Sequence, residues 1–248
     1  MAFENHDTDF SGKRVLVVGG SAGIGNAVAQ GFLKRGAEVH VWARKPSAKD
    51  YEGVPESDLE GIHYHQMNVA DFEAVENWQA PFDSLDVVVC AQGHVIYKRG
   101  EFKWKGFQEV TDVNLTANMV IIDKFLPMLE KTKGSAIVVS STAAYHATVG
   151  NPAYNASKAG AVALVRTLGA AYARSGVRVN GLAPGFVPTR MTEVTTARED
   201  RADAMRSRIP MGRFGKPEDM AGVCLFLASP LAAYVTGQTI ACDGGLVL

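Results

Sequence analysis

A tyrosine and a lysine stand four positions apart in the segment Tyr154-Asn155-Ala156-Ser157-Lys158. On a helix this spacing places the phenol and the ammonium group on one face. A cation near a phenol lowers the pKa of the hydroxyl, which then donates and accepts protons more readily near neutral pH. Because such pairs also arise by chance, the interpretation depends on the residues around them.

Ser140 and Ser141 supply that support, because they end the apolar run directly before this segment. In open parallel sheets, reactive groups collect at the carboxyl ends of strands, next to a bound dinucleotide. Ser141 is therefore a candidate catalytic group that acts together with Tyr154 and Lys158.

A glycine-rich turn, Gly19-Gly20-Ser21-Ala22-Gly23-Ile24-Gly25, follows the first apolar run and leads directly into a helical pattern. Glycines let the backbone approach a phosphate closely, and the following helix presents unpaired N–H groups and a partial positive charge. The order of strand, turn and helix predicts a dinucleotide-binding site in which Gly19, Gly23 and Gly25 are the key positions.

Arg44 follows the second apolar run. At this place in dinucleotide folds an acid binds the ribose hydroxyls, whereas a basic residue accommodates a 2′-phosphate. Arg44 therefore favours NADP as the cofactor. NAD stays the alternative, because an arginine can also stack on adenine without selecting the phosphate, and Ala22 adds no second basic group.

Short apolar runs alternate with helical patterns along the chain. The runs are Arg14–Val18, Glu38–Trp42, Ile62–Met67, Leu85–Cys90, Ser135–Ser140, Val177–Leu182 and Thr239–Cys242. The helical patterns are Ile24–Arg35, Phe107–Leu129, Pro152–Arg174 and Pro217–Leu227. Runs that are apolar on both faces are typical of parallel strands covered by helices. We predict an α/β fold: a single-domain Rossmann fold over residues 1–248, with a doubly wound parallel seven-stranded sheet and helices on both faces.

Three local features refine this prediction. Asn151 and Pro152 are expected to start the third helix, with Asn151 capping the free N–H groups. The segment Lys45–Gly61 contains two prolines and is expected to be a loop in place of a crossover helix. The charged segment at about 190–213, Arg190–Arg213, is expected to be a variable substrate lid, because loops of this length are usually functional.

The composition excludes several classes of partner. Lys+Arg 25 against Asp+Glu 26 leaves almost no net charge, which argues against nucleic acid and anionic membranes as partners. No apolar stretch reaches the roughly 18 residues of a membrane span. The three cysteines, Cys90, Cys224 and Cys242, are far apart, which argues against a disulfide framework and favours a cytoplasmic protein.

Gly19-x-x-x-Gly23-x-Gly25, Asn114, Ser141 and Tyr154-x-x-x-Lys158 together resemble the short-chain dehydrogenase/reductase family. The resemblance runs from about Lys13 to Gly245. Further matching segments are Asp112–Leu115, Pro184–Thr189, Gly215–Asp219, Thr236–Gln238 and Asp243–Gly245.

The resemblance implies hydride transfer between NAD(P)(H) and a small carbonyl or secondary alcohol substrate. It implies that Tyr154 is the general acid in reduction and the base in oxidation, and that Ser141 polarises the substrate oxygen. Lys158 would hold the nicotinamide ribose and lower the pKa of Tyr154, and Asn114 would position a water that links Lys158 to solvent. These roles suit the chemistry, because a hydride arriving at carbon builds negative charge on oxygen.

The resemblance also implies the contacts of the cofactor and the assembly. The expected cofactor contacts are Gly19, Ser21, Gly23, Ile24, Gly25, Arg44, Asn68, Val69, Ala91, Gly93, Tyr154, Lys158, Pro184, Gly185, Val187 and Thr189. The family usually forms dimers or tetramers through long helices, so a homo-oligomer, with a homotetramer first, is expected through Phe107–Leu129 and Ala153–Arg174.

Two positions depart from the family pattern. The usual Asn-Asn-Ala-Gly is Cys90-Ala91-Gln92-Gly93, and the usual Asp near adenine is Asn68. Because an amide still accepts a hydrogen bond through its carbonyl, we expect altered cofactor affinity rather than lost binding.

Other residues carry weaker signals. Substrate walls are expected from His94, His146, Phe186 and Met191, with simple packing as the alternative. The basic and aromatic segment His94–Lys105 suits either an anionic substrate or a surface loop. His63 and His65 share a strand face, but no third ligand stands at a recognisable spacing, so no metal is expected.

These features favour an alcohol dehydrogenase or ketone reductase. A 3-oxoacyl-carrier-protein reductase is the main alternative substrate class. A dinucleotide-binding regulatory protein without catalysis is the alternative from another class, and the altered Cys90–Gln92 turn motivates it.

Overall fold

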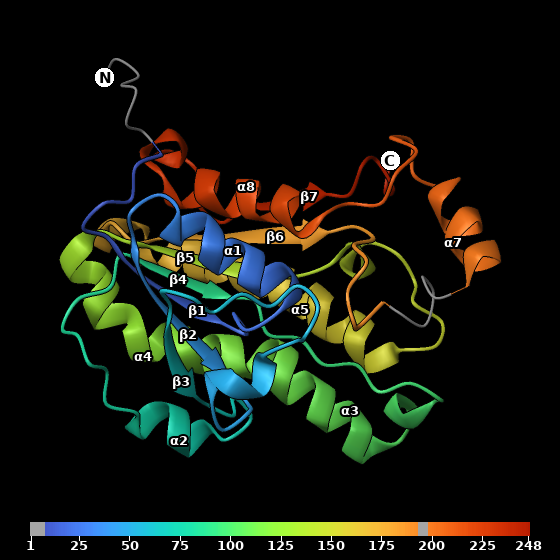
Figure 1. The fold of residues 1–248 in the computed structure, drawn as a ribbon, viewed down its shortest axis with the longest axis horizontal. Coiled ribbons are helices and arrows are strands. Elements are labelled where there is room, and N and C mark those ends of the chain that lie inside the picture. The colour runs from blue at the N-terminus through green and yellow to red at the C-terminus, as the bar shows by residue number, and fades with distance from the viewer. Residues whose placement is uncertain (1–7, 193–197) are drawn as a thin grey trace.

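The computed structural model describes residues 8–192 and 198–248. Seven strands form one sheet in the order β3-β2-β1-β4-β5-β6-β7, and every neighbouring pair is parallel (Figure 1). The strands are β1 (Arg14–Val18), β2 (Glu38–Ala43), β3 (His63–Gln66), β4 (Val87–Cys90), β5 (Ser135–Val139), β6 (Arg178–Pro184) and β7 (Thr239–Cys242). The predicted seven-stranded parallel sheet is confirmed, with strand ends that shift by one or two residues.

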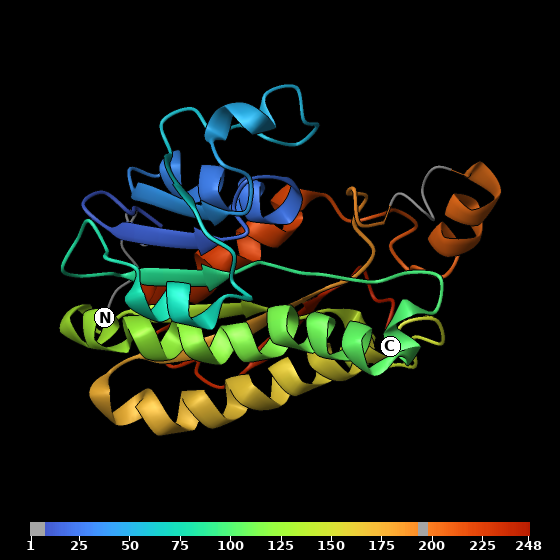
Figure 2. The ribbon, with the colours of Figure 1, turned by 90° about the horizontal axis from the view of Figure 1, so that it is seen from below.

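Helices cover both faces of the sheet, as predicted (Figures 1 and 2). One face carries α1 (Gly23–Leu33) and α8 (Pro217–Ala228). The other carries α2 (Phe72–Asn77), α3 (Trp104–Thr111), α4 (Ala117–Thr132) and α5 (Pro152–Tyr172). The remaining helix, α7 (Glu199–Arg206), stands apart at one end of the molecule (Figure 1).

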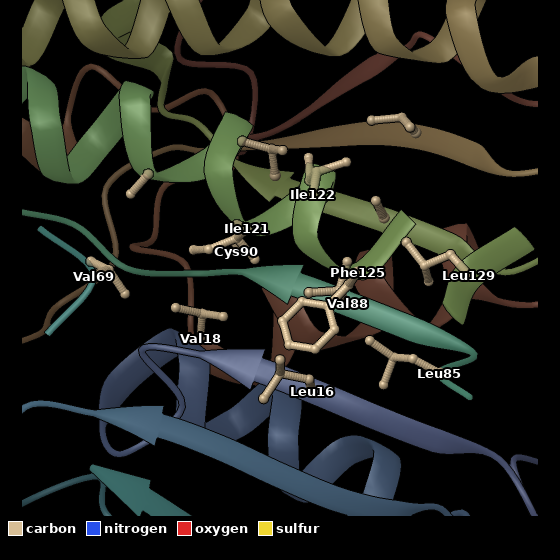
Figure 3. Packing of buried hydrophobic residues seen from close by; sticks show 14 of the residues in the cluster. Leu16, Val18, Val69, Leu85, Val88, Cys90, Ile121, Ile122, Phe125 and Leu129 are labelled. Carbon is tan, nitrogen blue, oxygen red and sulfur yellow. The ribbon is translucent and has the colours of Figure 1, made fainter. Parts of the chain in front are cut away.

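Alternate residues of each central strand enter two separate cores. Leu16 packs with Phe125 of α4 in the core shown in Figure 3. Its neighbour Val17 points the other way and packs with Phe32 of α1. Burying each such side chain stabilises the fold by roughly 1.5–3 kcal/mol. Strands buried on both faces read as continuous apolar runs, which is why their positions could be predicted.

The strand order also fixes the place of the site. The chain leaves β1 and β4, which are neighbours, toward opposite faces of the sheet, and a crevice opens beyond their carboxyl ends. Gly19 follows β1 in this crevice with φ +77, and a Cβ there would lie 2.8 Å from the backbone nitrogen of Gln92. Only glycine permits this approach of the two strand ends.

Four segments differ from the prediction or refine it. The helix expected over Phe107–Leu129 is α3 and α4 joined by a π-helical turn, Asp112–Thr116. Two short helices, α2 and α7, were not predicted, because six and eight residues are too few for a clear periodic pattern. Segment Lys45–Gly61 has only one 3-10 turn, as expected of a loop. The expected lid contains α7, and its residues 193–197 lie outside the described residues.

Among the described residues, no helix has both the length and the apolar character that a membrane span requires.

Candidate active site

A cavity of about 850 Å³ lies beyond the carboxyl ends of the strands. It is lined by the glycine turn and by Ser141, Tyr154 and Lys158. Every residue expected to contact the cofactor also lines it, namely Gly19, Ser21, Gly23, Ile24, Gly25, Arg44, Asn68, Val69, Ala91, Gly93, Tyr154, Lys158, Pro184, Gly185, Val187 and Thr189. The tertiary structure thus brings the glycine turn and the tyrosine–lysine pair to one cavity.

Of the four residues expected to contact substrate, two line this cavity and two do not. His94 and Met191 belong to its lining. His146 is exposed and only its backbone carbonyl accepts a hydrogen bond, from Asn155. The Phe186 ring packs against that of Phe214, tilted by 40° with 5.2 Å between the ring centroids. A contact of Phe186 or His146 with substrate stays a prediction.

Tyr154 occupies the first turn of α5, where its phenol is hydrogen-bonded to the hydroxyl of Ser141. Burial raises the pKa of Tyr154 above its usual value, and the Ser141 hydroxyl partly offsets that rise. The phenol is therefore protonated at neutral pH, which is the form that donates a proton.

Lys158 is not among the groups that shift the pKa of Tyr154 in this structure, so its expected effect on that pKa stays a prediction. The Lys158 ammonium points to the backbone, where Nζ donates to the Val139 carbonyl at 2.8 Å, and it lies 5.7 Å from the centroid of the Tyr154 ring. Its own burial lowers the pKa of Lys158 to about 8. Desolvation therefore dominates at both groups, because a charge in an apolar environment loses its hydration.

Lys158 lies beside Ser140, which follows β5, and Cys90, which ends β4. The Ser140 hydroxyl donates to the Lys158 carbonyl at 2.8 Å. The Cys90 thiol is fully buried, and burial raises its pKa to about 12. Cys90 is therefore a small apolar residue and not a reactive thiol, as its position at a strand end suggested.

Asn114 is fully buried in the π-helical turn and does not line the cavity. Its Oδ1 accepts from the backbone N–H of His94 at 2.8 Å, and its Nδ2 donates to the His94 carbonyl at 2.9 Å. Nδ2 also contacts the Ser157 hydroxyl at 3.2 Å. Asn114 therefore fixes the backbone of His94, one of the cavity residues. Its role toward a water remains a prediction.

A buried carboxylate, Glu101, was missed by the sequence analysis. Its Oε2 accepts from the backbone N–H of Tyr154 at 2.9 Å, and its Oε1 accepts from the N–H of Ile96 at 3.0 Å and from Asn151 Nδ2 at 3.1 Å. The side chain is 1% exposed. Glu101 thus connects the segment after His94 to the helix that carries Tyr154.

The prediction that Asn151 caps α5 is wrong, because the Glu101 carboxylate accepts the N–H of Tyr154 at this end of the helix. The Asn151 side chain accepts no hydrogen bond from the helix and donates its amide to Glu101 and to the Ile96 carbonyl. A carboxylate is the stronger acceptor at the positive end of a helix. The signal in the sequence was a single acid within a basic and aromatic segment, but spacing alone did not connect it to Tyr154.

Replacing Glu101 with glutamine is expected to lower the free energy of unfolding by about 1–3 kcal/mol, because the new amide places donors against donors. It should also lower kcat while the affinity for the cofactor changes little, since Glu101 acts on the position of Tyr154. Urea unfolding and steady-state kinetics measure the two effects. Glu130→Gln, an exposed change on α4, is the matched control. Equal behaviour of the two variants would contradict the positioning role.

The glycine turn fits a dinucleotide. A Cβ on Gly25 would lie 2.2 Å from the Gly19 carbonyl, so the turn closes only with glycine there. The start of α1 has neither a side-chain cap nor an acidic residue in its first turn, which leaves its positive end to an anion. Gln92 lines the cavity, and its buried Oε1 has no partner within the described residues, whereas its Nε2 donates to Asn118 at 2.7 Å. This oxygen is an available acceptor for a cofactor hydroxyl.

Charges of both signs line the cavity at its adenine end. Arg44 is exposed and forms no ion pair within residues 8–192 and 198–248. Its neighbour Lys45 instead lies over the Tyr51 ring, 4.5 Å from the centroid. Glu56 accepts the N–H of Gly23 through its carbonyl at 3.0 Å, and burial raises the pKa of its carboxyl. Arg44 is thus a cation available to a phosphate, and Arg190 is a second arginine in the cavity lining.

Two loops meet at the mouth of the cavity. The Tyr97 hydroxyl donates to the Met191 carbonyl at 2.6 Å, which joins the segment after β4 to the segment after β6. His94 Nε2 lies 2.9 Å from a Glu109 carboxylate oxygen.

Comparisons with known proteins agree with this geometry. A family model described as enoyl-(acyl carrier protein) reductase matches residues 18–247. The 3-oxoacyl-[acyl-carrier-protein] reductase FabG of Rickettsia typhi is 34% identical over 97% of this chain and 99% of that protein. FabG of Thermotoga maritima is 36% identical over 96% of this chain and 98% of that protein.

Solved structures are also similar over nearly the whole chain. The active-site complex of Pseudomonas aeruginosa RhlG with NADP has a TM-score of 0.88 and 29% identity, and it covers 99% of this chain and 100% of that one. A short-chain type dehydrogenase/reductase from Mycobacterium marinum has a TM-score of 0.85 and 28% identity, with 97% and 98% covered.

Proposed function

This chain belongs to the short-chain dehydrogenase/reductase family of NAD(P)-dependent oxidoreductases, and we propose that it works mainly as an NADPH-dependent reductase of a ketone to a secondary alcohol. The observation that carries the proposal is the cavity shared by the glycine turn, Ser141, Tyr154 and Lys158. An enzyme assay of the purified protein with NADPH and with NADH against a panel of ketones and alcohols tests it. No turnover across the panel would contradict it.

The bound nicotinamide supplies or accepts the hydride. Ser141 donates a hydrogen bond to the substrate oxygen, and Tyr154 gives that oxygen its proton as negative charge builds on it. The raised pKa of Tyr154 supports reduction, because the enzyme starts from the protonated phenol. Lys158 holds the ribose from within the same cavity.

The preference for NADP is supported by Arg44 and by the NADP complex of RhlG. We expect Arg44→Ala to weaken NADPH binding roughly 10- to 100-fold, because a hydrogen bond to a charged group contributes about 1.5–3 kcal/mol. NADH binding should change less than about twofold, since NADH lacks the 2′-phosphate. Fluorescence titration of both cofactors at one salt concentration measures the effect.

Neighbouring charges provide the controls for Arg44. Lys45→Ala removes an adjacent cation that Tyr51 already contacts, and it should leave NADPH affinity nearly unchanged. Glu56→Gln removes the carboxylate beside Gly23 and should strengthen the binding of either phosphate-bearing cofactor. Equal loss of NADPH and NADH affinity in Arg44→Ala would show that Arg44 does not select the phosphate.

A 3-oxoacyl thioester on a carrier protein is the second candidate substrate. It is supported by the FabG relatives and by the basic residues Lys98, Arg99, Lys103 and Lys105, which follow the cavity residue His94. A comparison of kcat/KM for acetoacetyl-pantetheine with that for a free ketone of equal chain length separates the two candidates. A preference for the free ketone would exclude the carrier-bound substrate.

The non-catalytic alternative is disfavoured by the complete set of Ser141, Tyr154 and Lys158 in one cavity. Binding of cofactor without turnover of any substrate would restore it.

Assembly and location are further parts of the proposal. Trp104 and Phe107 of α3 are 71% and 40% exposed beside α5, which supports a homo-oligomer that covers this side of the molecule. Sedimentation velocity measures its size. The cysteines Cys90, Cys224 and Cys242 are free, which supports a reducing compartment such as the cytoplasm.

A further inference from the structure

A cluster of histidines lies at the edge of the sheet formed by β2 and β3. The register pairs His40 directly with His63, and Glu38 and His65 stand two positions away on the same face. The sequence analysis considered His63 and His65 alone and found no third ligand. The third and fourth groups come from the neighbouring strand, because parallel pairing aligns residues that are 23 positions apart.

Three of the four side chains contact one another through polar atoms, and the fourth, His63, stacks on His40. His40 Nε2 lies 2.9 Å from Glu38 Oε1, and His40 Nδ1 lies 2.9 Å from His65 Nε2. The His40 and His63 rings stack with 4.7 Å between centroids. One ligand atom each of Glu38, His40 and His63 falls within a common distance of 4.8 Å.

We propose that Glu38, His40 and His63 bind one divalent transition metal ion of the zinc class, and that His65 orients His40 by accepting a hydrogen bond. Imidazole nitrogens with one carboxylate are a ligand set that suits zinc, with water as the fourth ligand. His40 is 3% exposed, whereas Glu38 and His63 are exposed, and their side chains would have to turn toward the ion.

The hydrogen bonds around His40 allow the ion to bind without a net change of protons. If His40 Nε2–H donates to Glu38 in the metal-free protein, its Nδ1 accepts from His65. With metal on Nε2, the proton of His40 moves to Nδ1 and is donated to His65, whose own proton moves to its Nδ1. Such an outer partner fixes the tautomer of a metal-binding histidine.

Neighbouring side chains contact the Glu38 carboxylate and the His40 ring. Arg14 contacts Glu38 Oε2 through Nε and Nη2, both at 3.1 Å, which leaves Oε1 toward His40. The Phe82 ring lies 4.8 Å from that of His40 and covers the inner side.

The ion would connect the edge strand β3 to β2. Glu38 begins β2, whereas Arg44 follows its other end and lines the catalytic cavity, so the metal lies away from the reacting groups. The expected role is to stabilise the edge of the sheet.

Cobalt(II) titration of the metal-free protein tests the proposal, because tetrahedral cobalt bound to nitrogen and oxygen ligands absorbs in the visible range. We expect one cobalt per chain, displaced by zinc, and zinc should raise Tm by roughly 5 °C at saturation. His63→Asn should lose the absorption and the Tm shift, with the Tm of the metal-free protein unchanged because His63 is exposed. Glu38→Gln should weaken binding at least 10-fold.

His146→Asn, another exposed histidine, is the control and should bind cobalt as the wild type does. The proposal is overturned if cobalt binds equally to wild type and His63→Asn, if magnesium binds as well as zinc, or if the wild type binds no metal at micromolar concentration. None of these readouts depends on turnover, so they are independent of the proposed reductase activity.

Discussion

Tyr154→Phe is expected to lower kcat by about 100- to 10,000-fold, because general acid catalysis contributes a factor of this size. The substitution removes one hydroxyl from a side chain whose phenol is hydrogen-bonded to Ser141. The ring stays in place on α5, so the Kd for NADPH should change less than about threefold. Absorbance assays of NADPH oxidation and fluorescence titration measure kcat and Kd separately.

Tyr145→Phe is the matched control for this prediction. Tyr145 is 45% exposed and does not line the cavity, so removing its hydroxyl should leave kcat near the wild-type value. The role of Tyr154 as general acid fails if Tyr154→Phe retains more than about a tenth of the wild-type kcat.

The second large effect is expected from Lys158→Met. Lys158 is 3% exposed, and burial lowers its pKa from 10.5 to about 8. In the folded state the proton leaves near pH 8, whereas the unfolded chain keeps it until about pH 10.5. The unfolded state therefore binds more protons between these values, and the stability of the wild type rises with pH in that window. This difference in the pKa of Lys158 between the folded and unfolded states corresponds to about 3 kcal/mol of folding free energy.

Lys158→Met lacks the buried ammonium, so its free energy of unfolding should not rise between pH 8 and pH 10.5 as that of the wild type does. Below pH 8, where the wild type carries the buried charge, the variant should be more stable by up to about 3 kcal/mol. It should also turn over substrate far more slowly, because the ribose loses its anchor. Urea unfolding at several pH values measures the first effect, and steady-state kinetics the second.

Lys34→Met, an exposed change after α1, is the control for the pH series. It should follow the wild type at every pH. A constant difference in stability between wild type and Lys158→Met from pH 7 to pH 10 would refute the lowered pKa of Lys158.

The fold could be predicted from local patterns. Apolar runs such as Val15–Val18 are buried on both faces, and this burial appears in the sequence as a continuous run. The glycine turn could be predicted because its backbone conformation demands specific residues at specific positions. Short helices such as α2 could not, since six residues hold too few turns to show a period.

Some residues of the candidate site could also be predicted from local patterns, whereas others were found only in the folded structure. Ser141, Tyr154 and Lys158 belong to motifs within one strand and the next helix, so the sequence already named them and the structure brings them to one cavity. The Glu101 cap of α5 joins residues 53 positions apart, and no spacing rule connects them.

The amino-acid sequence alone was sufficient for the parallel seven-stranded sheet, the glycine turn and the tyrosine–lysine motif, because each appears as a pattern of residues that are near neighbours in the chain. Three features required the folded molecule: the raised pKa of Tyr154, the Glu101 cap, and the meeting of His40 with His63. Desolvation depends on every atom that surrounds a group, and contacts across strands depend on register. Neither quantity can be obtained from spacing along the chain.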